Sequence, residues 1–150
     1  MYLGPQRQLA QHVRNFLKSK YGICYTPPAC TTQVFPDVPC SSPFAPWINE
    51  LVTEGITAGC VSGYCPDYAV SRQQMAVFLL KTHDGASYVP PDCTSQNFAD
   101  VPCSSPFAPW IYELVRRNIT AGCGSGNYCP YKPNTRGQMA VFLTSTFGLF

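Results

Sequence analysis

Apolar residues between positions 43 and 54 fall on one face of a helix. They stand at i, i+3, i+4, i+7 and i+8, as Phe44, Trp47, Ile48, Leu51 and Val52. Ser42 is a suitable N-cap, and Pro43 suits the first helical position. The pattern therefore predicts a helix over 43–54. It ends at Gly55, because glycine tolerates the left-handed C-terminal cap.

A second helical pattern opens at Ser71. Gln74 follows three residues later, so the two side chains can satisfy each other's backbone amides in a capping box. The predicted buried face of this helix is formed by Met75, Phe78 and Leu79. A similar apolar stripe near the N-terminus predicts a leading helix, with Leu9, Val13, Phe16 and Leu17 on its buried face.

The chain repeats itself with a shift of 63 residues. Residues 30–60 and 93–123 are identical at 24 of 31 positions without a gap. The second copy has Asn118 in place of Gly55, and asparagine also tolerates a left-handed cap. It has its own capping pair in Thr135 and Gln138. We therefore predict an all-α fold of tandem helix–loop–helix repeats, divided into a leading helix (1–22), repeat 1 (23–85) and repeat 2 (86–150).

Composition narrows the function classes. Charged residues make up 12% of the chain, the net charge is +2, and no run of Lys or Arg occurs, so a nucleic-acid partner is not expected. The chain contains no stretch of 18 apolar residues, so no membrane span is predicted. The first ten residues lack the apolar core of a signal peptide; if the protein is secreted, we expect the signal to have been removed or the numbering to start after it.

Cysteines are dense, and eight of the nine belong to the repeats. Each repeat spaces four of them as C-x9-C-x19-C, followed by four or five residues and a last cysteine. This density predicts disulfides in an oxidising compartment. The shortest loops pair Cys30–Cys40, Cys60–Cys65, Cys93–Cys103 and Cys123–Cys129, although four cysteines permit three pairings. A four-thiolate zinc site is the alternative; against it, the close C-x2-C pairs of structural zinc are absent.

Cys24 has no counterpart in either repeat. Either it is a free buried thiol, or it forms a disulfide to another molecule.

Several short blocks occur twice in the same order and resemble the S-layer homology family. In repeat 1 they are Phe35-Pro-Asp-Val, Phe44-Ala-Pro-Trp-Ile, Gly55-Ile-Thr-Ala-Gly, Tyr64-Cys-Pro and Ser71-Arg-Gln-Gln-Met-Ala-Val-Phe-Leu. The resemblance implies helix–loop–helix lobes that tether bacterial surface proteins to wall polysaccharide. It also implies ligand binding by the arginine that opens the second helix, which Arg72 and Arg136 match. The acidic residue of that motif is not matched, because Gln73-Gln74 and Gly137-Gln138 stand there.

Other polar and aromatic residues have a structural and a functional interpretation. Trp47 and Trp110 can stack on sugar, but their helical spacing favours a core role. Asp37 and Asp100 suit turns in which a carboxylate accepts backbone N–H groups. His12 and His83 share no motif, and no nucleophile–base pair or metal motif recurs, so we expect neither catalysis nor a cofactor.

These observations predict a secreted, non-enzymatic structural protein whose copies assemble head to tail into a surface layer or filament. One alternative is an anchor that binds cell-wall polysaccharide through Arg72, Arg136, Trp47 and Trp110. Another is a structural zinc module. The expected partners are copies of the chain itself and, in the second case, wall polysaccharide.

Overall fold

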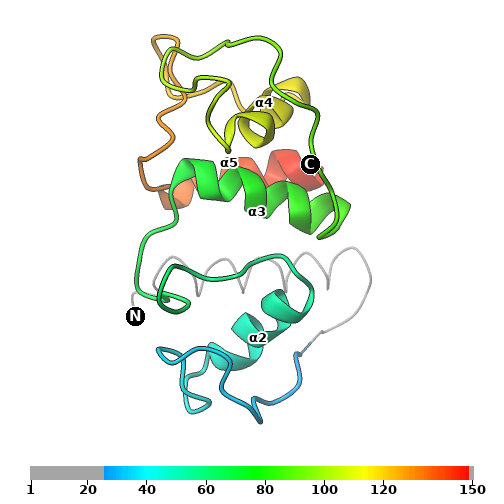
Figure 1. The fold of residues 1–150 in the computed structure, drawn as a ribbon, viewed down its shortest axis with the longest axis vertical. Helices are drawn as coiled ribbons and strands as arrows, with labels where there is room; N and C mark the ends of the chain where they lie inside the picture. Colours follow the sequence, from blue (N-terminus) through cyan, green and yellow to red (C-terminus); the bar gives the residue numbers. More distant parts are fainter. Residues whose placement is uncertain (1–25, 149–150) are drawn as a thin grey trace. The chain divides into compact units, whose positions relative to one another are not determined.

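The computed structural model describes residues 26–148, and this part of the chain is all-α, as predicted. Its four helices are joined by long irregular loops (Figure 1). They are α2 (Ala45–Thr53), α3 (Arg72–Asp84), α4 (Ala108–Arg116) and α5 (Arg136–Phe147). The leading helix, Cys24 and His12 lie outside the described residues. No described helix is long and apolar enough to cross a membrane.

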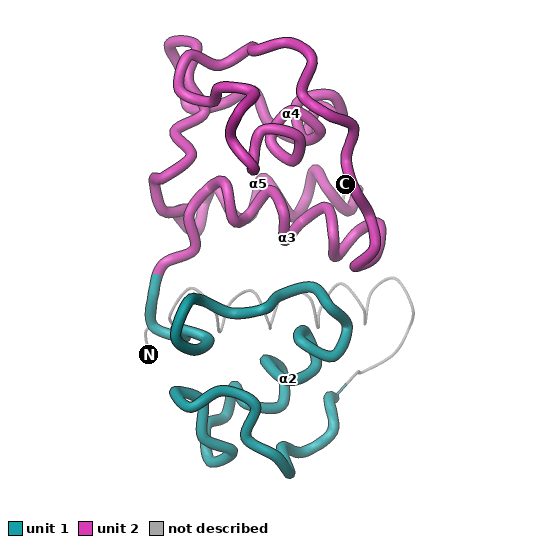
Figure 2. The backbone as a smooth tube through the Cα atoms, in the orientation of Figure 1, with its two compact units in different colours: residues 1–68 teal, residues 69–150 magenta. Residues whose placement is uncertain are grey.

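The chain divides into two compact units, residues 1–68 and residues 69–150 (Figure 2). The core of unit 1 forms where α2 meets the preceding loop, and Val38, Ala45 and Ile48 are buried there. Four partly buried residues pack around these three: Cys30, Phe35, Phe44 and Tyr64.

Unit 2 is built around α3, which packs against both α4 and α5 (Figure 1). From α3 the fully buried side chains are Met75, Ala76, Leu79 and Leu80. From α4 and α5 the buried apolar residues include Ala108, Ile111, Leu114, Phe142 and Leu143. By sequence α3 is the second helix of repeat 1, whereas α4 and α5 belong to repeat 2. One repeat therefore supplies a helix to the core of the next.

The start of the first helix of each repeat differs from the sequence prediction. α2 begins at Ala45 with Phe44 as N-cap, so the predicted N-cap Ser42 and first residue Pro43 were wrong. The reason is a turn before the helix, in which the Ser42 carbonyl accepts a hydrogen bond from the Ala45 N–H at 3.1 Å. The Ser42 hydroxyl accepts a further one from the Phe44 N–H at 3.3 Å.

The other helix ends follow the local sequence. Gly55 and Asn118 both have a left-handed φ, of 68° and 58°, which confirms their predicted capping role. The N–H of the next residue, Ile56 or Ile119, then bonds to a carbonyl five residues back, as in a Schellman motif. The two capping boxes that open α3 and α5 are also present.

Candidate functional site

In the described part of the chain, four disulfides fix the loops, with the same partners as the shortest-loop pairing. Cys30–Cys40 and Cys93–Cys103 close the segments before α2 and α4, with Cα–Cα distances of 5.2 and 5.3 Å. Cys60–Cys65 and Cys123–Cys129 close the loops after these helices, each with a Cα–Cα distance of 6.0 Å. Cysteines joined in this way are not thiolate ligands. Within residues 26–148, no group of three His, Cys, Asp or Glu side chains is placed to hold a metal.

The loops after α2 and α4, here called the first loop (59–65) and the second loop (122–129), are held by an aspartate. Asp37 accepts hydrogen bonds from the N–H groups of Tyr64 and Cys65, at 2.9 and 2.7 Å. Asp100 does the same in repeat 2, at 2.8 and 2.7 Å. The Tyr64 and Cys65 N–H groups hold the pKa of Asp37 below its ordinary value. The sequence predicted a turn role for these aspartates, but the amides lie 27 to 29 residues away.

An aromatic pair completes each loop with the same geometry. Phe35 and Tyr64 have ring centroids 5.5 Å apart and tilted by 48°. Phe98 and Tyr128 have values of 5.6 Å and 46°. The two loops therefore present a tyrosine in the same way, and burial raises the pKa of both tyrosines.

Arg72 enters the second loop. Its Nε donates to the carbonyl of Tyr128 at 2.8 Å, and one terminal nitrogen donates to the carbonyl of Gly122 at 3.4 Å. The guanidinium carbon lies 4.7 Å from the centre of the Tyr128 ring and 5.3 Å from that of Phe142. The Tyr128 hydroxyl in turn donates to the carbonyl of Arg72 at 3.0 Å.

This setting favours a structural role for Arg72. Only 3% of the residue is exposed, so a polysaccharide in solvent has little access to it. Two backbone carbonyls and two ring faces replace the water that the buried guanidinium loses. Tyr128 was not singled out from the sequence, although the recurring Tyr-Cys-Pro block gave a signal for it.

Arg136 occupies the matching position in α5, but it is exposed. The residues around it are also less covered than their counterparts in α3. Ala140 is exposed where Ala76 is fully buried, and Met139 is half-buried where Met75 is fully buried. We call Arg136, Met139, Ala140 and Thr144 the open face of α5. The structure therefore separates the two arginines that the sequence treated alike.

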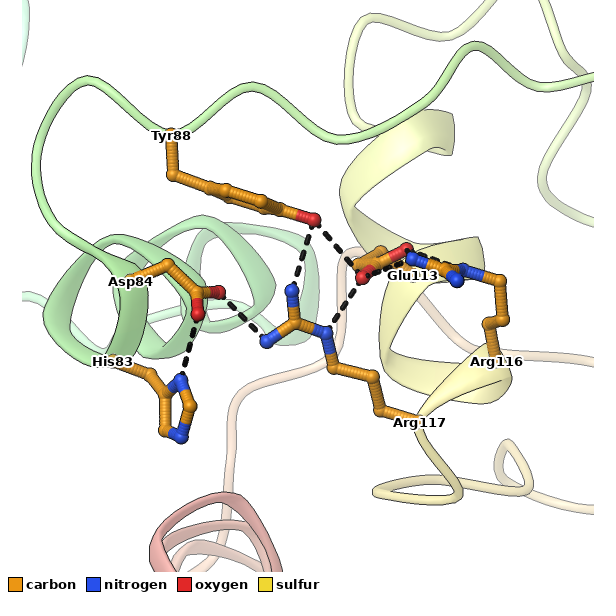
Figure 3. A network of polar contacts seen from close by, with 6 residues as sticks. All are labelled: His83, Asp84, Tyr88, Glu113, Arg116 and Arg117. Atoms are coloured by element: carbon orange, nitrogen blue, oxygen red, sulfur yellow. Dashed lines mark hydrogen bonds and ion pairs between the residues drawn. The ribbon is translucent and has the colours of Figure 1, made fainter.

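A polar network joins the end of α3 to α4 (Figure 3). Glu113, whose side chain is 1% exposed, accepts hydrogen bonds from Arg116, Arg117 and Tyr88 at 2.6 to 2.9 Å. Arg117 also donates to Asp84 at 2.6 Å and to the Tyr88 hydroxyl at 2.9 Å. The sequence did not reveal this network, because repeat 1 has Thr53 and Glu54 where repeat 2 has the two arginines.

Burial and hydrogen bonding act in opposite directions on these carboxyl groups. Burial alone raises the pKa of Glu113, but hydrogen bonds from Arg116, Arg117 and Tyr88 outweigh it and lower that pKa. The pKa of Asp84 is lowered in the same way, because the His83 and Arg117 side chains bond to it. Both carboxyl groups are therefore ionised at neutral pH.

The remaining candidate residues take separate places. Trp47 and Trp110 are half-buried, and the Trp110 ring meets the Tyr88 ring edge-on at 6.3 Å. His83 lies 2.8 Å from Asp84 at the end of α3. In the described part of unit 2, no hydrogen bond or ring contact joins Trp110 to Arg72 or Arg136.

Comparison with family models matches residues 34–76 to the S-layer homology domain. A comparison with curated proteins gives no match. The matched segment runs from just before Phe35 to the first turn of α3, and it contains the first loop and Arg72. Domains of this family associate proteins with the cell surface, commonly by binding cell-wall polysaccharide. Residues 34–76 therefore match the S-layer homology domain, the family that the recurring blocks of the sequence resemble.

Proposed function

We propose that the chain is a secreted, non-enzymatic structural protein of the bacterial cell surface, whose copies assemble head to tail into a layer or filament. The observation that carries the proposal is the place of α3. It closes repeat 1 in the sequence, yet it is buried in the core of unit 2 together with α4 and α5. A helix of this type therefore packs against the repeat that follows it.

The same type of helix recurs as α5. α3 is covered by α4, whereas no described helix covers the open face of α5 in this way. A contact between unlike surfaces of identical chains propagates unless its rotation closes a ring. Four disulfides suit an assembly that must persist outside the cell, because each short bridge contributes about 2–3 kcal/mol to stability in the loop-entropy model.

Negative-stain electron microscopy of the purified 150-residue chain tests the proposal, at neutral pH and without reductant. Ordered fibres or sheets are the expected result. Size-exclusion chromatography with light scattering gives the mass of the species in the same sample. A single monomeric species over a wide concentration range contradicts the proposal.

A second candidate function is an anchor that binds wall polysaccharide, which is common in the family. Arg136 favours it, since this exposed cation stands in the first turn of α5, where it opposes the helix dipole. A cation in that position gains from an anionic ligand. The proposed ligand is an acidic wall polymer, and the half-buried Trp47 and Trp110 offer rings for sugar stacking.

Co-sedimentation with purified cell wall distinguishes the two functions. An anchor binds wall as a monomer, and Arg136→Ala weakens the binding. Arg72 is unsuitable as a probe because its replacement disturbs the core of unit 2. Assembly without any wall binding excludes the anchor function and leaves the structural one.

A further inference from the structure

We propose that Asn118 is a glycosylation site, at which the side-chain amide carries an N-linked oligosaccharide. Asn118, Ile119 and Thr120 form an Asn-x-Thr triplet, and the 150 residues contain no other Asn-x-Ser or Asn-x-Thr. Such a triplet is the acceptor for this modification in secreted chains. The inference goes beyond the proposed assembly and rests only on the proposed secretion.

The backbone role of Asn118 does not need its side chain. Asn118 follows α4 with a φ of 58°, and its N–H donates to the Val115 carbonyl at 2.9 Å. Gly55 does the same after α2, with a φ of 68° and a bond of 2.9 Å to the Val52 carbonyl. Since a residue without a side chain forms the same cap, the cap does not account for the carboxamide of Asn118.

The carboxamide of Asn118 is also accessible. The residue is exposed, and among residues 26–148 no group forms a hydrogen bond with its side chain. By contrast, the side chains of Asn49, Asn127 and Asn134 donate to backbone carbonyls at 3.2 to 3.3 Å. An oligosaccharide is bulky and strongly hydrated, so it needs an exposed position of this kind.

Thr120 supplies the hydroxyl that the acceptor triplet requires. In the folded chain this hydroxyl accepts a hydrogen bond from the Gly122 N–H at 3.2 Å, and Ile119 is only 6% exposed. Folding therefore engages two residues of the triplet and leaves Asn118 at the surface. Because a transferase has to bind the hydroxyl together with the asparagine, we expect the transfer to precede folding of the second loop.

The two repeats differ at this triplet by a single residue. Repeat 1 has Gly55 before Ile56 and Thr57. The Thr57 hydroxyl accepts a hydrogen bond from the Gly59 N–H at 3.3 Å, as the Thr120 hydroxyl does from Gly122. The chain therefore contains the same local structure once with the acceptor amide and once without it.

The transfer uses a sugar donor that the cell supplies, an oligosaccharide linked to a polyprenyl pyrophosphate. The Nδ2 atom of Asn118 attacks the anomeric carbon of the first sugar. A bond forms between this nitrogen and this carbon, and the bond from the carbon to the pyrophosphate oxygen breaks. The polyprenyl pyrophosphate leaves with the electron pair, and the amide nitrogen loses one proton to a base of the transferase. Nothing is oxidised or reduced.

Mass spectrometry tests the site on the chain isolated from the surface or the medium of the cells that make it. After reduction, trypsin cleaves behind Arg117 and releases a peptide that begins with Asn118. The mass of this peptide should exceed that of its sequence by a whole number of sugar residues, and fragmentation should place the increment on Asn118. If the peptide from the exported chain has the unmodified mass, the inference is overturned.

Asn118→Gly is the matched control. It copies Gly55, so the cap and the export of the chain are retained, but the oligosaccharide should be lost. Thr120→Ser keeps a hydroxyl and should keep the modification, whereas Thr120→Val should lose it although Asn118 is present. A sugar that persists in Asn118→Gly or in Thr120→Val is attached elsewhere or by other chemistry, which contradicts the inference.

Gly55→Asn is the converse test, because it completes the same triplet with Ile56 and Thr57. The exported variant should carry a second oligosaccharide, on repeat 1. If repeat 1 is modified in this variant and Asn118 is not, the cells use such triplets but not the one in repeat 2, and the inference fails.

Failure of the inference and failure of the proposed function are distinct results. If the chain stays inside the cell, the proposed secretion fails and the inference falls with it. If the chain is exported without a sugar on Asn118, the proposed function stands and the glycosylation site is wrong.

Discussion

Arg72 and Tyr128 bind each other twice, although 56 residues separate them in the sequence. The Arg72 Nε donates to the Tyr128 carbonyl at 2.8 Å, and the Tyr128 hydroxyl donates to the Arg72 carbonyl at 3.0 Å. Both residues are almost fully buried, with exposures of 3% and 0%. This reciprocal pair attaches the last helix of repeat 1 to the second loop of repeat 2.

Replacing Arg72 should therefore destabilise unit 2. Arg72→Met keeps most of the side-chain volume but leaves the Tyr128 carbonyl without its donor and removes the guanidinium from the ring. We expect the free energy of unfolding to fall by about 2–4 kcal/mol, from the lost charged hydrogen bonds and the cation–π contact. Chemical denaturation measures it.

Arg136→Met is the matched control for Arg72→Met. Its denaturation is measured at a protein concentration too low for assembly. Arg136 is exposed, so its replacement should change the free energy of unfolding by no more than about 0.5 kcal/mol. Equal effects of the two substitutions contradict the difference in role between the two arginines.

The two arginines at the end of α4 should also differ in their effect on stability. Arg117 is 26% exposed in its side chain and bonds to Glu113, Asp84 and Tyr88, whereas Arg116 is 66% exposed and bonds to Glu113 alone. We expect Arg117→Ala to cost about 2–3 kcal/mol, because it leaves a buried carboxylate poorly paired. Arg116→Ala should cost much less, because an exposed ion pair contributes little to stability. Thermal unfolding of both variants ranks them.

The same network predicts how stability depends on acid. The pKa values of Glu113 and Asp84 are lower in the folded chain than in the unfolded chain. Their contribution is therefore complete above the ordinary carboxyl pKa of about 4 and is lost as the pH falls through the folded values. The free energy of unfolding should decrease between about pH 5 and pH 2, and Glu113→Gln should flatten that decrease. If the slope of the free energy of unfolding against pH is unchanged in this variant, other carboxyl groups cause the loss of stability in acid.

The sequence predicted the features that depend on neighbouring residues. The capping boxes at Ser71 and Thr135 and the left-handed caps at Gly55 and Asn118 each need only a few consecutive residues, and all four were predicted. The helix start at Ala45 was missed, because Ser42 fits a turn as well as an N-cap.

Features that join distant segments were not predictable in the same way. A repeat alignment treats Arg72 and Arg136 as equivalent, and only packing shows that one is buried and the other exposed. The network of Glu113 and Arg117 has no copy in repeat 1, so the repeat gave no signal for it. Asp100 suggested a local turn, whereas its backbone partners come from the second loop.

Removing the disulfide of the second loop should loosen more than the loop itself. Tyr128 lies between Cys123 and Cys129, and Gly122 directly precedes Cys123. The carbonyls of Tyr128 and Gly122 accept the hydrogen bonds of Arg72. We expect the Cys123→Ser, Cys129→Ser double variant to lose about 2–3 kcal/mol through the loop-entropy effect alone. Faster amide exchange at the start of α3 should accompany this loss.

The corresponding double variant at Cys60 and Cys65 provides the control. The first loop lies in unit 1, and α3 lies in unit 2. Amide exchange in α3 should therefore stay close to that of the unaltered chain. Equal exchange in the two variants contradicts the special link between the second loop and α3.

Two glycines of unit 2 should respond to alanine in opposite ways. Gly122 has a φ of 96°, and a Cβ there meets the Asn127 carbonyl oxygen and, at 2.7 Å, the Phe98 ring. Gly122→Ala should therefore destabilise unit 2 by at least about 2 kcal/mol, through backbone strain together with the clash. Gly137 lies in the first turn of α5, and a Cβ there has no atom within 4 Å. Since alanine restricts the unfolded chain and fits the helix, Gly137→Ala should stabilise by about 0.4–1 kcal/mol. The denaturation midpoints of the two variants show directly which substitution destabilises and which stabilises. If Gly122→Ala is tolerated, the second loop does not hold its backbone as tightly as its contacts with Phe98 and Arg72 require.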